Sequence, residues 1–531
     1  MKLRAKLSLN EPSQQQLLTI FNSLKTNRGI TGASPLLIEM TIKLETDIID
    51  DGAYGRAVER FHEAGITLPK LSQLADPIAA RDVIEAQTKS TDPDAPDASN
   101  LFRVHWHNGP DRKTLVETPE HVVLPPELTG IEATIAVAVG NRFPMIRAHK
   151  VLAAYGCLVP RLVTGQFDPT HHRAVWPSTG NYCRGGVAIS RILGCRSVAV
   201  LPEGMSRERF AWLENWVTDQ SDIVRTYGTE SNVKEIYDAC NEMAQDAENV
   251  ILNQFNEFGN YVAHRAVTGP ALERIFNAVN KDGSKRMAAY VAASGSGGTL
   301  AAGDYLKDKL GAKICAVEAL ECPTLLNNGY GDHNIQGIGD KHVPFIHNVL
   351  NTDFVVAVSD KASNALNLVF NTTPGRSYLA KRTGINQEFS SELANLGLSS
   401  IANVLGAIKM AKYLGLGPDD VIVTVATDGA EMYGTEIEKI RSETYGGMFD
   451  EFSAAEAYGR YMLGMTTDNM QEMNLRDRER VFNLGYYTWV EQQGVSLSDF
   501  DVRRDQSFWN GLMDAVPAWD KMIDDFNRAA S

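Results

Sequence analysis

Short apolar runs alternate with longer helical patterns through the middle of the chain, from about residue 101 to residue 440. The runs are rich in β-branched residues and end in glycine-containing turns, as in SVAVLPEG (197–204), KICAVEAL (313–320) and VIVTVATDG (421–429). An apolar strand followed by a turn and a long helix is typical of a parallel sheet that helices cover on both faces. The pattern therefore predicts an α/β domain.

The two ends of the chain have a different pattern. Residues 1–100 are polar with helical periodicity, and they end in a run rich in Pro, Asp and Ser, KSTDPDAPDASN, where we expect a boundary. From about residue 441 the pattern is again helical, and its spacing predicts that Val481, Leu484, Tyr487 and Trp489 face the core. We predict three parts: a helical N-terminal extension (1–100), a core (101–440) and a helical C-terminal extension (441–531).

Composition narrows the possible functions. The 531 residues carry a formal charge of −15, which disfavours binding to nucleic acid or to an anionic membrane. Apolar stretches such as 131–140 are far shorter than the ~20 residues of a membrane span. The N-terminal MKLRAKLSLNEPSQQQ has no apolar signal region, and the six cysteines have no CxxC spacing. We expect a cytoplasmic protein with reduced, buried thiols.

A glycine-rich loop follows one predicted strand. Residues 294–299, Ser-Gly-Ser-Gly-Gly-Thr, lie between an apolar run and a helical pattern, where backbone N–H groups can surround a phosphate. The loop is neither a dinucleotide fingerprint, since the third glycine would fall at Leu300, nor a P-loop, since no Lys follows. A tight turn without a ligand is the alternative.

A second loop precedes another predicted helix. Ser178-Thr179-Gly180-Asn181 offers hydroxyls, an amide and a helix start, which together can bind a carboxylate. An ordinary helix cap is the alternative.

In combination, these segments resemble the fold-type II pyridoxal-phosphate (PLP) enzymes, such as cysteine synthase, threonine synthase and diaminopropionate ammonia-lyase. The resemblance covers about residues 140–440 and implies two lobes, each with a mostly parallel sheet flanked by helices, the smaller at about 160–270. The matching segments, in chain order, are STGN with VAVLPEGMSRERF (198–210), NQFNEFGNYVAHRAVTGP (253–270), GSGGT (295–299), the IQGIG run within 317–344, and LSSIANVLGAIKMAK (398–412) with VIVTVATDGAEMYGT (421–435).

Lys150 is the candidate for the covalent link to the cofactor. PLP chemistry needs a lysine that forms an imine and later moves the substrate α-proton. The common family pattern S-x-K-x-R is absent, but NRFPMIRAHKVL (141–152) resembles the ammonia-lyase version, and Lys150 is the only lysine between residues 114 and 231. Alternatively, Lys150 is a solvated helix residue, and Arg147 occupies the reactive position of an inactive protein.

The resemblance also implies roles for other residues. Asn181 would bind the ring hydroxyl, and Thr427 would face the pyridine nitrogen, with Asp428 left open as the alternative. Tyr182 replaces the usual Thr or His and would narrow the pocket. The phosphate would be held by Gly295, Ser296, Gly297, Gly298 and Thr299. The substrate side would consist of Ser178, Thr179, Gly180, Tyr182, Gln336 and Gly337.

The implied activity is α,β-elimination on a small L-amino acid, of ammonia-lyase or desulfhydrase type, through an aminoacrylate intermediate. One alternative is a β-replacement synthase of the cysteine synthase type, and another is a non-catalytic PLP-binding paralogue. Thr179 stands where diaminopropionate ammonia-lyase has an aspartate, which argues against turnover of both enantiomers of that substrate. The family implies a homodimer, and no metal site is expected, since His105 and His107 lack carboxylate or Cys partners at fitting spacing.

Overall fold

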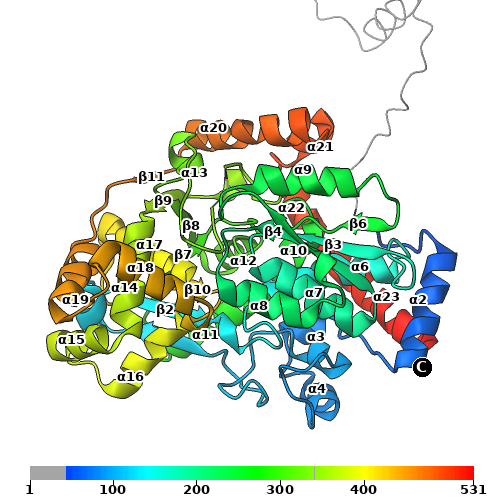
Figure 1. Ribbon diagram of the computed structural model, residues 1–531, viewed down its shortest axis with the longest axis horizontal. Helices are drawn as coiled ribbons and strands as arrows, with labels where there is room; N and C mark the ends of the chain where they lie inside the picture. Colours follow the sequence, from blue (N-terminus) through cyan, green and yellow to red (C-terminus); the bar gives the residue numbers. More distant parts are fainter. Residues whose placement is uncertain (1–43, 340) are drawn as a thin grey trace, which may run out of the picture. The chain divides into compact units, whose positions relative to one another are not determined.

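The computed structural model describes residues 44–339 and 341–531, so residues 1–43 of the predicted N-terminal extension lie outside the described residues. Two separate sheets organise the described chain (Figure 1). The larger sheet has seven strands in the order β1-β2-β10-β7-β8-β9-β11, and the smaller has four in the order β5-β4-β3-β6. All neighbours are parallel except β1 with β2 and β9 with β11, at the two edges of the larger sheet. The predicted α/β architecture with two mostly parallel sheets is confirmed.

The strands coincide closely with the apolar runs of the sequence. Those of the larger sheet are β1 (His121–Leu124), β2 (Thr134–Val139), β7 (Arg286–Ala293), β8 (Lys313–Ala319), β9 (Phe354–Val358), β10 (Asp420–Ala426) and β11 (Met470–Glu472). Those of the smaller sheet are β3 (Arg173–Pro177), β4 (Arg196–Pro202), β5 (Ile223–Thr226) and β6 (Asn249–Ile251). All four strands of the smaller sheet lie within residues 160–270.

Alternation along the central strands separates two hydrophobic cores. In β10, Val421, Val423 and Val425 belong to one core, while Ile422 and Ala426 belong to the other. Successive side chains of a strand point to opposite faces, so a strand buried on both faces is apolar throughout. The core helices are α5 (Pro126–Thr129), α6 (Lys150–Val163), α7 (Asn181–Leu193), α8 (Arg207–Trp216), α9 (Val233–Met243), α10 (Phe258–Ala263), α11 (Gly269–Val279), α12 (Ala301–Leu310), α13 (Thr324–Asn327), α14 (Asp360–Asn371), α15 (Thr373–Thr383), α16 (Gln387–Glu392), α17 (Leu398–Leu414) and α18 (Gly434–Tyr445).

Two glycines let helices α6 and α10 approach closely. A Cβ on Gly156 would stand 2.5 Å from Ala263 Cβ, and one on Gly259 would stand 2.2 Å from the Gly156 carbonyl oxygen. Only glycine fits at such a contact. The crossing brings the segment before α10 next to Lys150, the first residue of α6.

The two extensions meet on one side of the molecule. Helix α2 (Asp51–Ala64) packs on α23 (Ala515–Ala529) (Figure 1). The rings of Tyr54 and Phe61 lie edge-on to the ring of Phe526. Tyr487, expected in the core, is 65% exposed, whereas Trp489 is fully buried. The other helices of the extensions are α3 (Leu71–Ala75), α4 (Arg81–Thr88), α19 (Glu451–Tyr458), α20 (Leu475–Tyr486), α21 (Leu497–Val502) and α22 (Gln506–Gly511).

Among the described residues, no single helix is long and apolar enough to cross a membrane. The pair Gln387–Asn395 and Leu398–Leu414 passes that test only when taken together, and its two parts are bent by 108°. Most of α17 is buried between β-strands and helices of the core.

Candidate active site

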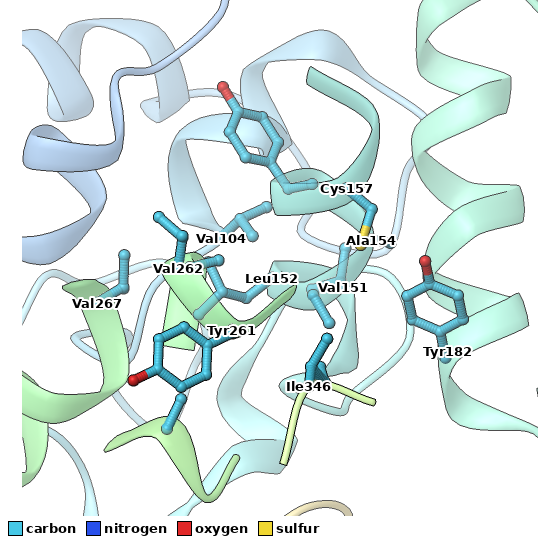
Figure 2. Close-up of a cluster of buried hydrophobic side chains, with 14 of the residues drawn as sticks. Val104, Val151, Leu152, Ala154, Cys157, Tyr182, Tyr261, Val262, Val267 and Ile346 are labelled. Atoms are coloured by element: carbon cyan, nitrogen blue, oxygen red, sulfur yellow. The ribbon is translucent and has the colours of Figure 1, made fainter. Parts of the chain in front are cut away.

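Lys150 begins α6 and is only 8% exposed. Its Nζ donates to Ser296 Oγ at 3.0 Å and to Gln254 Oε1 at 3.3 Å. The residues that follow it, Val151 and Leu152, are fully buried in a cluster of apolar side chains (Figure 2). The amine therefore lies inside the protein against the glycine-rich loop, which excludes a solvated surface lysine.

The backbone before Lys150 has an unusual conformation. Met145 and Arg147 both have positive φ, 61° and 50°, a region that non-glycine residues rarely adopt. The Met145 N–H donates to the Pro93 carbonyl, and Arg147 Nη2 donates to Asp94 Oδ2 at 3.1 Å. The Arg147 side chain is 49% exposed, so it does not take the reactive position. The Pro/Asp-rich run near residue 94, predicted as a boundary, instead supports the lysine loop.

The glycine-rich loop joins β7 to α12. Gly297 has a φ of 83°, and a Cβ on Gly298 would stand 2.2 Å from Asn260 Oδ1. The backbone N–H groups of Gly295, Ser296, Gly297 and Thr299 donate to no acceptor among the described residues. Bare N–H groups at the start of a helix are the usual means of binding a phosphate.

Two small adjoining cavities, of about 20 and 10 Å³, meet at Lys150. Their walls have in common Lys150, Gly295, Ser296, Gly337, Ile338 and Thr427. The first is completed by Ser178, Thr179, Asn181, Tyr182, Gln254 and Phe255, and the second by Ala293, Gly297, Thr299, Asn403 and Val425. The loops that the sequence predicted separately therefore surround one amine.

The loop from Ser178 to Asn181 forms one wall of the first cavity. Ser178 Oγ accepts a hydrogen bond from the Gly180 N–H at 2.9 Å, which shapes the turn into α7. Tyr182 donates its hydroxyl to the Leu252 carbonyl at 3.0 Å, so its ring is fixed as a wall. We predicted that Tyr182 narrows this space, and its buried position is consistent with that role.

Thr427 and Asp428 are in different surroundings. Thr427 lines both cavities, whereas Asp428 lines neither. Asp428 Oδ2 accepts from Asn181 Nδ2 at 2.7 Å, from Tyr433 OH at 3.0 Å and from Arg209 Nη2 at 3.4 Å. This placement favours Thr427 as the group that faces a ring in the cavity.

Asn181 connects the cavity with this buried network. Its Nδ2 donates one hydrogen bond to Asp428, and its Oδ1 accepts one from Arg184 Nη1 at 2.9 Å. An amide nitrogen carries two hydrogens, so one remains for a ring hydroxyl. Burial lowers the pKa of Arg184 to about 10, with the nearby Arg209 acting in the same direction.

Arg209 and Glu230 lie behind the cavity walls. Burial lowers the pKa of Arg209, but its anionic neighbours, Asp428 and Glu230 among them, outweigh burial and raise that pKa above its ordinary value. Burial raises the pKa of Glu230 to about 7, although Arg209 and Thr179 act against the shift. Glu230 Oε1 accepts from the Gly337 N–H at 2.6 Å and so links two walls of the cavity.

Three residues predicted to bind ligand do not line the cavities. Gln336 is buried with its Oε1 3.3 Å from the Ser206 N–H, Gly180 packs against Arg209, and Gly298 packs against Asn260. The two glycines permit close packing behind the walls.

Sequence reasoning missed several residues of the site. Gln254 and Asn260 belong to a segment that matched the family, but no role was assigned to them. Asn260 Nδ2 donates to Ser296 Oγ at 3.1 Å, and His149 Nε2 is 3.4 Å from Thr299 Oγ1. Their position between matched motifs was the available signal.

The histidines near residue 105 are structural. His105 and His107 are buried, and burial lowers the pKa of His107 to about 4. Among the described residues, no group of three His, Cys, Asp or Glu side chains is arranged to hold a metal ion. The six cysteines are buried thiols, and none of them forms a disulfide among the described residues.

Known proteins share this site's framework. The family profile described as "Pyridoxal-phosphate dependent enzyme" matches residues 144–368. Cysteine synthase B of Campylobacter jejuni is 32% identical over 254 residues, 47% of this chain and 74% of that protein. A probable cysteine synthase of Bacillus subtilis is 29% identical over 283 residues, 53% of this chain and 82% of that protein.

The fold is also found among solved structures. O-acetyl serine sulfhydrylase isoform 3 of Entamoeba histolytica has a TM-score of 0.50 and 22% identity, covering 65% of this chain and 95% of that chain. The chain belongs to the pyridoxal-phosphate dependent enzymes of fold type II, the class that its lobes and lysine loop define. The site fits that cofactor: Lys150 provides an amine, the loop from Gly295 to Thr299 provides four backbone N–H groups without an acceptor among the described residues, and the two cavities lie between them.

Proposed function

We propose that the protein is a PLP-dependent lyase that eliminates the β-substituent of a small L-amino acid. The observation that carries this proposal is the position of the Lys150 amine, buried where the two cavities meet. Bound PLP would act as an electron sink for negative charge at the substrate α-carbon. The other requirements fall to side chains of this chain.

Lys150 is the base that the proposal needs. Its Nζ points at Ser296 and Gln254, between the predicted carboxylate loop and the phosphate loop, where it can reach an α-proton. Ser178, Thr179 and the start of α7 would hold the substrate carboxylate. Thr427 would place a neutral hydroxyl at the pyridine nitrogen of bound PLP, which supports departure of a β-substituent over chemistry that needs a protonated pyridine.

The walls of the first cavity support a small substrate. The rings of Tyr182 and Phe255 line this cavity, whose volume of about 20 Å³ leaves little free space beside Lys150.

β-Replacement is the second candidate, favoured by the names of the relatives. The matched proteins of Campylobacter jejuni and Bacillus subtilis are a cysteine synthase and a probable one. Both reactions use the same residues of this chain, so an experiment must separate them.

The experiment supplies the PLP-loaded protein with L-serine, L-cysteine, L-threonine and 2,3-diaminopropionate, each with and without sulfide. Release of a keto acid and ammonia without sulfide is the expected result. Product formation only with sulfide, as a new amino acid, would establish replacement instead. PLP binding without turnover of any of these amino acids would support the non-catalytic PLP-binding paralogue.

A further inference from the structure

Arg503, in the C-terminal extension, is buried in an unusual way. Its guanidinium carbon lies 3.9, 5.0 and 4.5 Å from the ring centres of Phe345, Phe482 and Phe500. Among the described residues no carboxylate forms an ion pair with it, and burial, assisted by the charge of Arg504, lowers its pKa to about 9. Burying an unpaired charge is costly, and aromatic faces offset only part of that cost.

Arg503 makes one hydrogen bond within the extension, from its Nε to the Phe500 carbonyl at 3.2 Å, and one to the backbone of the core. Its Nη1 donates to the Phe345 carbonyl at 2.7 Å. Trp489 Nε1 donates to the Val343 carbonyl at 2.7 Å, and Trp509 Nε1 donates to the carbonyl of Arg503 itself at 2.7 Å. The C-terminal extension therefore holds residues 342–348, which we call the bridging segment, at two of its carbonyls.

The bridging segment in turn holds the wall of the cavity. The N–H groups of Phe345 and Ile346 both donate to the Phe255 carbonyl, at 2.9 and 3.2 Å. Phe255 lines the cavity, and its neighbour Gln254 accepts a hydrogen bond from Lys150. Two hydrogen bonds, one from Arg503 to the Phe345 carbonyl and one from the Phe345 N–H to the Phe255 carbonyl, therefore connect Arg503 to this wall of the cavity.

The same segment reaches the phosphate loop. A Cβ on Gly297 would stand 3.2–3.3 Å from the backbone and Cβ of His347, so the two backbones are in close contact. Ile346 lies in the same buried cluster as Val151 and Leu152, which follow Lys150 (Figure 2). The bridging segment therefore touches the wall, the loop and the helix that define the cofactor site.

We propose that the C-terminal extension is a working part of the cofactor site, and that Arg503 is a positioning residue that sets the phosphate loop through the bridging segment. The proposal concerns cofactor binding and does not depend on which reaction the enzyme catalyses. It assigns a role to the part of the chain beyond the matched core. A purely stabilising extension is the alternative that the test must exclude.

The test compares Arg503→Met with Arg504→Met in the full chain. Arg504 is a matched control because it also stacks on Phe482, at 4.1 Å, but its hydrogen bonds stay within the extension, to Glu479, Asn483 and Asp501. The readouts are the Kd of PLP by titration, the phosphorus NMR shift of the bound phosphate and the Tm of the protein without cofactor.

We expect Arg503→Met to raise the Kd of PLP about tenfold and to shift the phosphorus signal, because the Phe345 carbonyl loses its buried donor. Arg504→Met should change the Kd of PLP by less than about twofold and leave the phosphorus signal unchanged. Arg503→Lys, which keeps a cationic donor, should recover part of the affinity. Wild-type Kd and phosphorus shift in Arg503→Met would overturn the proposal, even if the Tm falls.

A second variant covers the case in which Arg503→Met does not fold. Trp489→Phe keeps a large ring but removes the donor to the Val343 carbonyl. It should weaken PLP binding severalfold and shift the phosphorus signal. An unchanged Kd and an unchanged phosphorus signal in Trp489→Phe would show that the extension only stabilises the fold.

Discussion

The cavity around Lys150 and the network around Asp428 are both buried and polar, and Asn181 belongs to both. In the cavity, four backbone N–H groups of the phosphate loop have no acceptor in the described part of the chain, and glycines keep the walls open. In the network, Asp428 is bonded to Asn181, Arg209 and Tyr433. Polar groups left unsatisfied indicate where a ligand binds, and satisfied ones indicate what holds the walls in place. Substitutions in the cavity should therefore mainly impair the cofactor site, whereas substitutions in the network should mainly lower stability.

The largest effect is expected on the cavity side, from Lys150→Ala. Loss of the amine removes both the covalent link to PLP and the base, so turnover should fall about a thousandfold or more. Borohydride reduction followed by mass spectrometry should find the cofactor on Lys150 in the wild type only. Lys234→Ala, at an exposed lysine of α9, serves as the control. Attachment at another lysine would contradict the assignment.

On the network side, Asp428→Asn should mainly reduce stability. Asparagine keeps only one acceptor oxygen and leaves the buried charge of Arg209 without its partner, which should cost about 3 kcal/mol of unfolding free energy. Denaturant titration measures the loss. Asp238→Asn breaks an exposed ion pair and should cost less than about 1 kcal/mol. Equal losses in the two variants would mean that the network is not a stabilising unit.

Glu230 connects the two clusters, and it should make stability depend on pH. Its pKa is raised from 4.5 to about 7 by burial, so the folded state holds its proton more tightly than the unfolded state. Stability is therefore lost as pH rises from 4.5 to 7, by up to about 3 kcal/mol from this group.

The matched comparison is Glu230→Gln against Glu242→Gln, an exposed site. Unfolding free energies between pH 5 and pH 8 should fall less steeply in Glu230→Gln than in the wild type. The slope of Glu242→Gln should match the wild type. If the slope of Glu230→Gln also matched the wild type, Glu230 would not be the titrating group.

A smaller effect is expected from Gly297→Ala in the phosphate loop. Gly297 and Gly311 both have positive φ, so alanine at either site should cost about 1–2 kcal/mol of stability. Only at Gly297 does a Cβ approach His347, whereas Gly311 faces open space. PLP titration should show affinity weakened about tenfold in Gly297→Ala and unchanged in Gly311→Ala. Equal affinities would remove Gly297 from the cofactor site.

Much of the fold could be predicted because apolar runs coincide with buried strands. The run at 313–320 became β8, and the run at 421–429 became β10. The strand β11, Met470–Glu472, was not predicted, because this edge strand is short and only half-buried, so it carries no apolar pattern. Tyr487 was expected in the core but is exposed, because helical spacing alone does not show where a partner surface ends.

The sequence by itself determined the chemistry of this protein: an amine at Lys150, a glycine-rich loop and an asparagine loop, each formed by neighbouring residues. Tertiary structure decided which groups meet. It turned Asp428 toward Arg209 rather than the cavity, placed Glu230 behind Gly337, and tied Arg503 to the Phe345 carbonyl. Local patterns report residue type and backbone preference, whereas contacts between residues more than a hundred positions apart depend on how two sheets and two extensions pack together.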